Sequence, residues 1–362
     1  MRGHARARRR DRRVYLRSHP LLFGLLAATR GRPVRRLGRT LLVHDAGAYR
    51  EALTRLPLDR TAAGTTGGAA RAALGGSGGV LFDQEGSGHR ADRRGLAGEL
   101  GTASVARLRS VWQPLLVRRL APLAEGGEVD LVELSRELAG AVVCALLDCA
   151  ADPRAVARAA AEAAAASVRS HLPGPRRPGA QAAAARAADR LRRLLGPADE
   201  ALSAMVAVAA VNTTVAALPR SVAWCAHAGL WDQAADEALR PALADELLRV
   251  TAASPLLPRV AASQGSVGGC PVRGGDRLLL VARHAAEAHR RDPDAREPAG
   301  PGLAHLVFGA GPHACPGAGA ARFLLTDVLA ALAPYRPVVT RARVDRRAAL
   351  PGWRSLTVRA GS

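Results

Sequence analysis

One loop near the end of the chain limits the possible folds more than any other stretch. It reads Phe308-Gly-Ala-Gly-Pro-His-Ala-Cys315-Pro-Gly317, and the alanine- and leucine-rich residues 318–332 that follow predict a helix. Glycines at 309, 311 and 317 have no Cβ, so the backbone can pass close to the sulfur and to a flat ligand. The helix N-terminus would direct its positive dipole end at that sulfur, and Phe308 would shield it from water. The loop therefore predicts a buried, metal-binding thiolate.

A competing interpretation of the same loop is a dinucleotide-binding turn, because residues 309–314 also satisfy that glycine pattern. Pro312 and His313 stand where the phosphate-binding turn should be, and too little chain follows for a βαβ unit. This alternative is the weaker one. The other cysteines have no paired spacing, so we interpret them as small buried hydrophobic residues in a reducing compartment. They are Cys144, Cys149, Cys225 and Cys270.

An acid and a base three residues apart, Glu246 and Arg249, form a second feature, since positions at this spacing share a helix face and can pair. Pro241 suits the first turn of the helix that would carry them. Two strand-like runs follow, at residues 259–262 and 277–281. Three other Glu/Arg pairs have the same spacing, and such pairs usually lie on solvated helix faces: Glu133/Arg136, Glu237/Arg240 and Glu287/Arg290.

Two further features lie upstream of the loop. Residues 204–224 predict a long apolar helix with a polar step at Asn212 and Thr213, which Pro219 is expected to kink. Nearer the N-terminus, His89 and Arg93 are one helical turn apart. Periodic apolar stretches at 105–120, 129–147 and 155–170 indicate a mainly helical protein with few, short strands.

Taken in order, these features resemble the cytochrome P-450 family of haem-thiolate monooxygenases. The loop matches the family pattern Phe-x-x-Gly-x-His-x-Cys-x-Gly at Phe308, Gly311, His313, Cys315 and Gly317. The resemblance implies a mainly α single-domain fold with a small β component. It places haem b between a distal helix at about 198–228 and the helix after the loop at about 317–333, with Cys315 as the iron ligand.

The resemblance also assigns roles to the other features. It implies that Glu246 and Arg249 form a buried structural pair, with Arg296 as a candidate third member. Two buried haem propionates need cationic or hydrogen-bonding partners. The residues at the matching positions are His89, Arg93, Arg259 and His313.

On the distal helix, the resemblance makes Thr213 the oxygen-handling threonine and Asn212 the replacement of the usual acid, with Ala210 in place of a usual glycine. An amide orients water but does not relay a proton as a carboxyl does. The alternative is a threonine that hydrogen-bonds back to its own helix. A largely apolar substrate pocket is expected from Val206, Ala209, Ala210, Leu256 and Leu257, with residues 61–79 as a gating loop.

The net charge of +21 comes from 52 basic residues, all of them arginine. The arginines are scattered and no nucleic-acid-binding motif accompanies them, so we favour a compositional bias over nucleic-acid binding. A basic surface near Cys315 would attract an acidic electron carrier such as a ferredoxin. Residues 1–18 are expected to be a disordered basic leader to a catalytic domain spanning 19–362. The apolar run that begins at Leu21 is too short for a membrane span, and the first amphipathic helix is expected there.

The sequence therefore predicts a cytoplasmic enzyme, with neither membrane nor nucleic acid as a partner. It would oxidise a hydrophobic small molecule, of the kind made in secondary metabolism, using dioxygen and electrons from a ferredoxin-type donor. Three alternatives stay open: an oxidative-coupling member, a haem-binding protein of the same fold with little turnover, and a basic nucleic-acid-binding protein. The second is supported by Asn212 and by the shortened segments 170–197 and 291–308.

Overall fold

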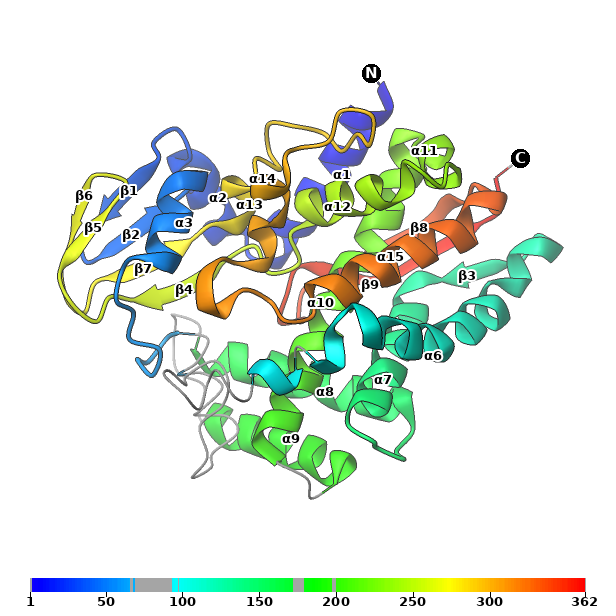
Figure 1. Ribbon diagram of the computed structural model, residues 1–362, viewed down its shortest axis with the longest axis horizontal. Helices are drawn as coiled ribbons and strands as arrows, with labels where there is room; N and C mark the ends of the chain where they lie inside the picture. Colours follow the sequence, from blue (N-terminus) through cyan, green and yellow to red (C-terminus); the bar gives the residue numbers. More distant parts are fainter. Residues whose placement is uncertain are drawn as a thin grey trace.

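The computed structural model describes residues 2–65, 68, 93–96, 98–171, 179–196 and 200–361. The longer helices are α1 (Arg2–Ser18), α2 (Pro20–Thr29), α3 (Ala46–Thr54), α6 (Thr102–Leu120), α7 (Leu131–Leu146), α8 (Pro153–His171), α9 (Ala180–Leu195), α10 (Glu200–Ala228), α12 (Arg240–Thr251) and α15 (Ala318–Leu332). Shorter helical segments are η1 (Ala121–Glu125), α11 (Trp231–Ala235), α13 (Ala282–Ala285), α14 (Pro301–Ala304), η2 (His305–Phe308), η3 (Gly311–His313) and η4 (Ala333–Tyr335). The predicted mainly α fold with a small β component is confirmed (Figure 1).

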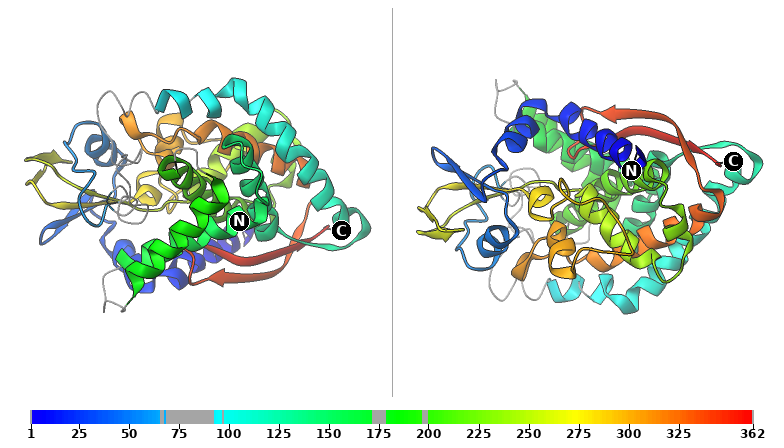
Figure 2. Two further views of the ribbon diagram at one scale, coloured as in Figure 1. Left: turned by 90° about the horizontal axis from the view of Figure 1, so that it is seen from below. Right: turned by 90° about the horizontal axis from the view of Figure 1, so that it is seen from above.

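Three small sheets accompany the helices. The first has the order β1 (Val34–Leu37), β2 (Thr40–Val43), β7 (Arg277–Leu280) and β4 (Leu257–Val260), and only its β2–β7 pair is parallel. The second has the order β3 (Glu128–Asp130), β9 (Gly352–Arg359) and β8 (Val338–Asp345). The third is the hairpin of β5 (Gly265–Val267) and β6 (Cys270–Val272). Figures 1 and 2 show the first and second sheets at opposite ends of the molecule, with the helices between them.

Helix α10 is the central element of the helical mass. It packs against α1, α7, α8 and α12 and continues through Pro219. Within the described residues, this is the one helix long and apolar enough to cross a membrane, over Ala201–Ala228. Half of that stretch is buried against other helices, which is typical of a core helix. The predicted distal helix at about 198–228 is thus present as Glu200–Ala228, and the predicted helix at about 317–333 as Ala318–Leu332.

The N-terminal segment differs from expectation, because residues 2–18 are ordered as helix α1 and are not a disordered leader. Asp11 is 4% exposed and accepts hydrogen bonds from Arg220 of α10 (2.9 and 2.6 Å) and from Arg283 of α13 (2.9 Å). Both guanidinium groups also lie over the ring of Tyr15, at 4.4 and 4.3 Å from its centroid. Val14 and Tyr15 are also buried, so apolar contacts as well as the Asp11 ion pairs hold this helix against the protein.

Two predicted element boundaries also shift. Val129 was expected to begin a helix and instead lies in strand β3, because Glu128–Asp130 pairs with β9 and Asp130 caps α7 through the Val132 N–H. The strand predicted at 259–262 starts two residues earlier, since Leu257 already pairs with Leu280 of β7. Both shifts follow from pairing with strands distant in the sequence, which a local pattern does not reveal.

Candidate functional site

The predicted cysteine loop connects η3 to the N-terminus of α15. The Cys315 N–H donates to the carbonyl of Phe308 (2.7 Å), and this bond closes the loop around Gly309 and Gly311, both with positive φ. A Cβ on Gly311 would stand 3.1 Å from Thr54 Cγ2 and 3.2 Å from the Leu53 carbonyl, so the loop lies close against the end of α3. Glycine is therefore required at 311 by both conformation and space.

The Cys315 sulfur lies beside the first residues of α15. Its side chain has accessible surface, although protein surrounds it on most sides, and this burial raises the pKa of the thiol. Two features act in the opposite direction and lower the pKa: a hydrogen bond from the Gly317 N–H and the positive charge of Arg93. The loop thus supplies an amide donor and a nearby cation that favour a thiolate at this position.

Helix α15 is fixed on two sides, which holds the loop in place. Asp327 accepts hydrogen bonds from Arg109 Nε (2.8 Å) and Trp112 Nε1 (2.8 Å), both on α6. Asp245 of α12 forms a bidentate ion pair with Arg322, with Nη2 to Oδ2 at 2.7 Å. Bidentate pairs of this kind restrict orientation as well as distance.

Glu246 and Arg249 are joined by two hydrogen bonds, Nε to Oε1 at 2.8 Å and Nη2 to Oε2 at 2.6 Å, and both side chains are 0% exposed. The guanidinium also donates to the carbonyl of Ala286 (3.1 Å), and the Ala299 N–H donates to Glu246 Oε1 (3.0 Å). By contrast, the Glu133/Arg136 and Glu287/Arg290 pairs are partly or largely exposed. Burial therefore distinguishes Glu246–Arg249 from these two pairs of equal spacing. The pair ties α12 to the segment that leads to the cysteine loop.

Arg296 does not occupy the third position that the sequence suggested. Its side chain is exposed, and its main-chain N–H donates to Asp294 Oδ1 (3.0 Å). Main-chain carbonyls of Arg291 and Asp292 accept from Arg249 instead, at 3.2 and 3.3 Å. Backbone groups thus satisfy the donors for which a further side chain was expected.

The candidate propionate partners come from separate parts of the chain. Arg93 is close enough to Cys315 for its charge to lower the pKa of the thiol, whereas His89 lies outside the described residues. Arg259 is on β4 and its Nη1 donates to the Pro258 carbonyl (2.8 Å). Burial, and then the charge of Arg60, lower the pKa of Arg259 to about 10. His313 lies at the end of η3 and is half-buried.

The sequence did not single out Arg60 and Tyr49, which both lie near Arg259. Tyr49 on α3 is 0% exposed, and its hydroxyl has no hydrogen-bond partner among the residues that the structure describes. Its phenol pKa is raised by burial, an effect that the Arg259 charge opposes. Two arginines and a buried hydroxyl therefore gather at one place. Because their positions in the sequence are unrelated, no spacing pattern could have indicated this cluster.

On the distal helix, Asn212 and Thr213 are both half-buried and both bonded within the protein. The Thr213 hydroxyl donates to the carbonyl of Ala209 (2.8 Å), which is the alternative considered from the sequence. The Asn212 amide donates to the carbonyls of Val208 (2.7 Å) and of Ala160 on α8 (3.3 Å). The donor group of each side chain is thus already hydrogen-bonded within the protein, while the Thr213 oxygen can still accept a hydrogen bond.

The predicted pocket residues belong to different apolar clusters. Val206 and Ala210 pack with residues of α7, α8 and α9. Leu256 packs with the cluster that contains Tyr15 of α1, whereas Leu257 packs with the cluster that contains Tyr49 of α3. The described contacts therefore place the α10 residues and the two leucines in separate clusters. Most of the predicted gating loop 61–79 lies outside the described residues.

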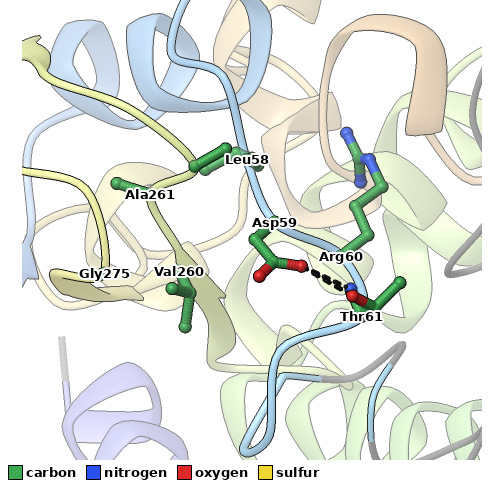
Figure 3. A pocket seen from close by; sticks show the side chains of 8 residues that line it. Leu58, Asp59, Arg60, Thr61, Val260, Ala261 and Gly275 are labelled. Carbon is green, nitrogen blue, oxygen red and sulfur yellow. Dashed lines mark hydrogen bonds between the residues drawn. The ribbon is translucent and has the colours of Figure 1, made fainter.

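A pocket of about 470 Å³ lies between the segment 58–61 and the strand end at Val260 (Figure 3). Asp59 Oδ1 accepts from the Thr61 N–H (2.9 Å) and from the Ala62 N–H (3.0 Å), which fixes the turn at its rim. Cys315 does not line this pocket. The pocket adjoins Arg60, and so lies beside the arginine cluster and not at the cysteine.

Comparison with known proteins finds similarity in the fold but not in the sequence. No protein-family model matches the chain, and no curated protein matches it. Solved structures do match. P450BioI, in complex with an acyl carrier protein ligated to hexadec-9Z-enoic acid, has a TM-score of 0.74 at 16% identity, covering 95% of this chain and 99% of its own.

Two further structures show the same likeness. Epothilone B-bound cytochrome P450epoK has a TM-score of 0.75 at 18% identity, covering 96% of this chain and 98% of its own. CYP164A2 from Mycobacterium smegmatis has a TM-score of 0.74 at 22% identity, with full coverage of both chains. The architecture is that of a helical protein with a cysteine loop entering a buried helix. The chain has the cytochrome P450 fold.

Proposed function

We propose that the protein is a haem-thiolate monooxygenase that oxidises a hydrophobic small molecule. The observation that carries this proposal is the Cys315 loop, with the Gly317 N–H on the sulfur and Arg93 nearby, at the start of a helix that is anchored on two sides. The sequence pattern of this loop and the fold around it are similar to those of haem-thiolate proteins. A shared fold alone does not define chemistry, so the proposal rests on the residues.

The residues present fit both the iron and the propionates of a haem. Cys315 would be the iron ligand, and coordination would deprotonate the thiol despite its raised pKa. Arg60, Arg259 and the Tyr49 hydroxyl bring two positive charges and a hydrogen-bond donor together, which suits the negative charge of two propionates. Arg93 and His313 are further candidates, together with His89. When bound, the haem iron would supply the activation of dioxygen, with the thiolate favouring cleavage of the O–O bond.

The protein's own residues would then manage protons and exclude water. Thr213 is proposed to accept a hydrogen bond from ordered water while it donates to the Ala209 carbonyl. Asn212 is proposed to hold water in place without relaying its own proton. Apolar residues of α10, including Val206, Ala209 and Ala210, would form part of the substrate pocket and would keep bulk water from it.

An acidic electron-transfer protein of the ferredoxin type is the proposed donor. Helices α6 and α15 pack against each other beside the cysteine loop. Exposed side chains on these two helices include the basic Arg107 and Arg118 and the apolar Val117 and Phe323. Such a surface would attract a carrier of opposite charge and then pack against it. The expected location is the cytoplasm, where such carriers and free thiols coexist.

A second candidate is a haem-binding protein of this fold with little turnover. The observation that favours it is the position of Asn212, whose amide donates to two main-chain carbonyls and replaces the acid that would relay protons. An oxidative-coupling reaction would use the same residues as hydroxylation. Turnover with a surrogate ferredoxin system separates the candidates.

The proposal is tested with a panel of hydrophobic small molecules titrated against the ferric protein. A monooxygenase should show a spectral change as a substrate displaces water from the iron, followed by an oxygenated or coupled product in the presence of electrons and dioxygen. Cys315→Ser should abolish both responses. Haem spectra of normal intensity without any product, across a wide panel, would favour the second candidate.

A further inference from the structure

Cys144 and Cys149 occupy two linked positions at the C-terminal end of α7. The helix ends at Leu146, Asp148 has a left-handed φ of 48°, and the Cys149 N–H donates to the Cys144 carbonyl at 2.9 Å. This bond defines a Schellman cap, in which the side chains of the two bonded residues commonly pack together. The cap therefore brings together two thiols whose spacing in the chain is not typical of a paired site.

The main-chain bond also limits how far apart the two residues lie. With standard bond lengths and a 2.9 Å hydrogen bond, their Cα atoms are at most about 6.8 Å apart. A disulfide requires Cα atoms within about 7 Å. Contact between the thiols is reflected in Cys144, whose pKa rises to about 11 mainly through burial and further through the Cys149 side chain.

Each thiol has a main-chain acceptor in the described structure. Cys144 Sγ donates to the Ala151 carbonyl (3.6 Å), and Cys149 Sγ donates to the Leu194 carbonyl (3.2 Å). Leu194 lies in the last turn of α9, where carbonyls have no partner within the helix. The Cys149 thiol thus connects the end of α7 to the end of α9, the helix that precedes α10.

We propose that Cys144 and Cys149 are a redox-active dithiol, which a hydroperoxide converts into an intrachain disulfide that releases the end of α9. In the first step the half-buried Cys149 sulfur attacks one oxygen of the peroxide and the O–O bond breaks. The sulfur becomes a sulfenic acid, and the other oxygen leaves as water or an alcohol. In the second step the Cys144 sulfur displaces the sulfenic oxygen as water and the S–S bond forms. Two thiols lose two electrons and two protons, and the peroxide is reduced by two electrons.

The structural consequence is specific to the Leu194 carbonyl. A disulfide has no S–H, so oxidation removes the donor that Cys149 supplies. The apolar residues of α9, including Leu191 and Leu195, stay buried against α8, so only the last turn should loosen. In a reducing compartment the dithiol form is the resting state, and a disulfide there would be transient.

The test uses the haem-loaded protein treated with hydrogen peroxide, then alkylated and digested for mass spectrometry. A link between residues 144 and 149, lighter by two hydrogens and reversed by dithiothreitol, is the expected result. Hydrogen exchange of amides in the last turn of α9 should become about fivefold faster on oxidation, because the loss of one hydrogen bond changes the local opening equilibrium by about that factor. Cys270→Ser, a matched change at a half-buried cysteine, should behave like the native chain.

Two variants at one position separate the thiol's roles. Cys149→Ser keeps an O–H donor but forms no disulfide, so its α9 exchange should be slow with or without peroxide. Cys149→Ala has no donor, so its exchange should already be fast in the reduced protein. The proposal is overturned if peroxide leaves both thiols free, if it produces sulfinic acid without a link, or if Cys149→Ala exchanges like the native chain.

Discussion

The carboxylate of Glu246 and the guanidinium of Arg249 lie one turn apart on α12, joined by two hydrogen bonds and 0% exposed. The removal of one partner leaves the other buried and charged, and burial of an unpaired ion is costly. We expect Glu246→Gln to lower the free energy of unfolding by about 3–5 kcal/mol, measured by urea denaturation. Glu133→Gln, which removes an exposed partner at the same spacing, should cost about 0–1 kcal/mol. Equal losses in the two variants would contradict the structural role.

Asp11 should prove essential for docking of the N-terminal helix. It neutralises Arg220, which is 1% exposed, and Arg283. Asp11→Asn should lower the free energy of unfolding by about 3–5 kcal/mol, because it leaves the buried Arg220 without a counter-ion. Asp292→Asn breaks the more exposed pair with Arg8 and should cost about 0–1 kcal/mol. If Asp11→Asn is as stable as the native chain, α1 is not held by this ion pair.

The fold and its centre were predictable from the sequence to different degrees. Helices α10 and α15 follow from apolar periodicity, and the Glu246–Arg249 pair follows from spacing together with Pro241. The ordered α1 was missed because its stability comes from Arg220 and Arg283, more than 200 residues away. A run of arginines in a sequence resembles a disordered tail. Only the structure shows that Asp11 within this run is buried and pairs with Arg220 and Arg283.

The site was predictable only where its residues follow one another in the chain. The loop from Phe308 to Cys315 is contiguous, so glycine spacing was sufficient to predict its tight turn, while the role of Cys315 stays a prediction. Tyr49 and Arg60 are 11 residues apart, whereas Arg259 on β4 is about 200 residues from both, and only the fold brings its charge close to them. Long-range proximity of this kind leaves no periodic pattern in a single sequence.

Acid should destabilise the protein through three histidines that lie side by side. The rings of His44 and His284 lie 4.9 Å apart with their Nδ1 atoms at 2.8 Å, and His289 lies 4.8 Å from His284. Burial alone lowers the pKa of His44 to about 4. Burial first, and then the charges of the neighbouring histidines and of Arg283 and Arg30, lower the pKa of His284 to about 2. Burial first, and then mainly the charges of Arg30, Arg290 and Arg283, lower the pKa of His289 to about 4. These cations also make the cluster unfavourable for a metal ion.

The sign of the effect follows from linkage. The folded pKa values lie below the ordinary value of 6.5, so the unfolded chain binds more protons as pH falls. This stabilisation is present above pH 6.5 and should be lost as pH falls from 6.5 to about 4 for His44 and His289 and to about 2 for His284, as followed by urea denaturation at each pH. His289→Gln should reduce this slope. A flat profile in the native chain would remove the cluster from acid stability.

The distal pair makes separate predictions about coupling of electrons to product. Thr213→Ala removes the hydroxyl that bonds the Ala209 carbonyl, and we expect more peroxide released per electron consumed. Thr213→Ser keeps the hydroxyl and should remain close to the native value. Unchanged coupling in Thr213→Ala would remove this residue from the mechanism.

Asn212 tests where protons come from. Asn212→Asp introduces a carboxyl beside Thr213, so the fraction of electrons that reaches product should rise if the native amide limits proton delivery. Asn212→Ala is the control for the loss of the amide donor to Ala160 and Val208, because it removes the amide without adding a carboxyl, and it should not improve coupling. No gain in Asn212→Asp with several substrates would show that proton delivery does not limit coupling.

The most direct measurement is the absorption spectrum of the reduced, carbon monoxide-treated protein, expressed with ample haem precursor. A thiolate from Cys315 opposite the bound gas should move the main band strongly to the red, and Cys315→Ser should lose that shift. Cys270→Ser is the matched control and should keep it. A native protein that stays colourless, or a Cys315→Ser spectrum identical to the native one, would contradict the assignment of Cys315 as the haem ligand.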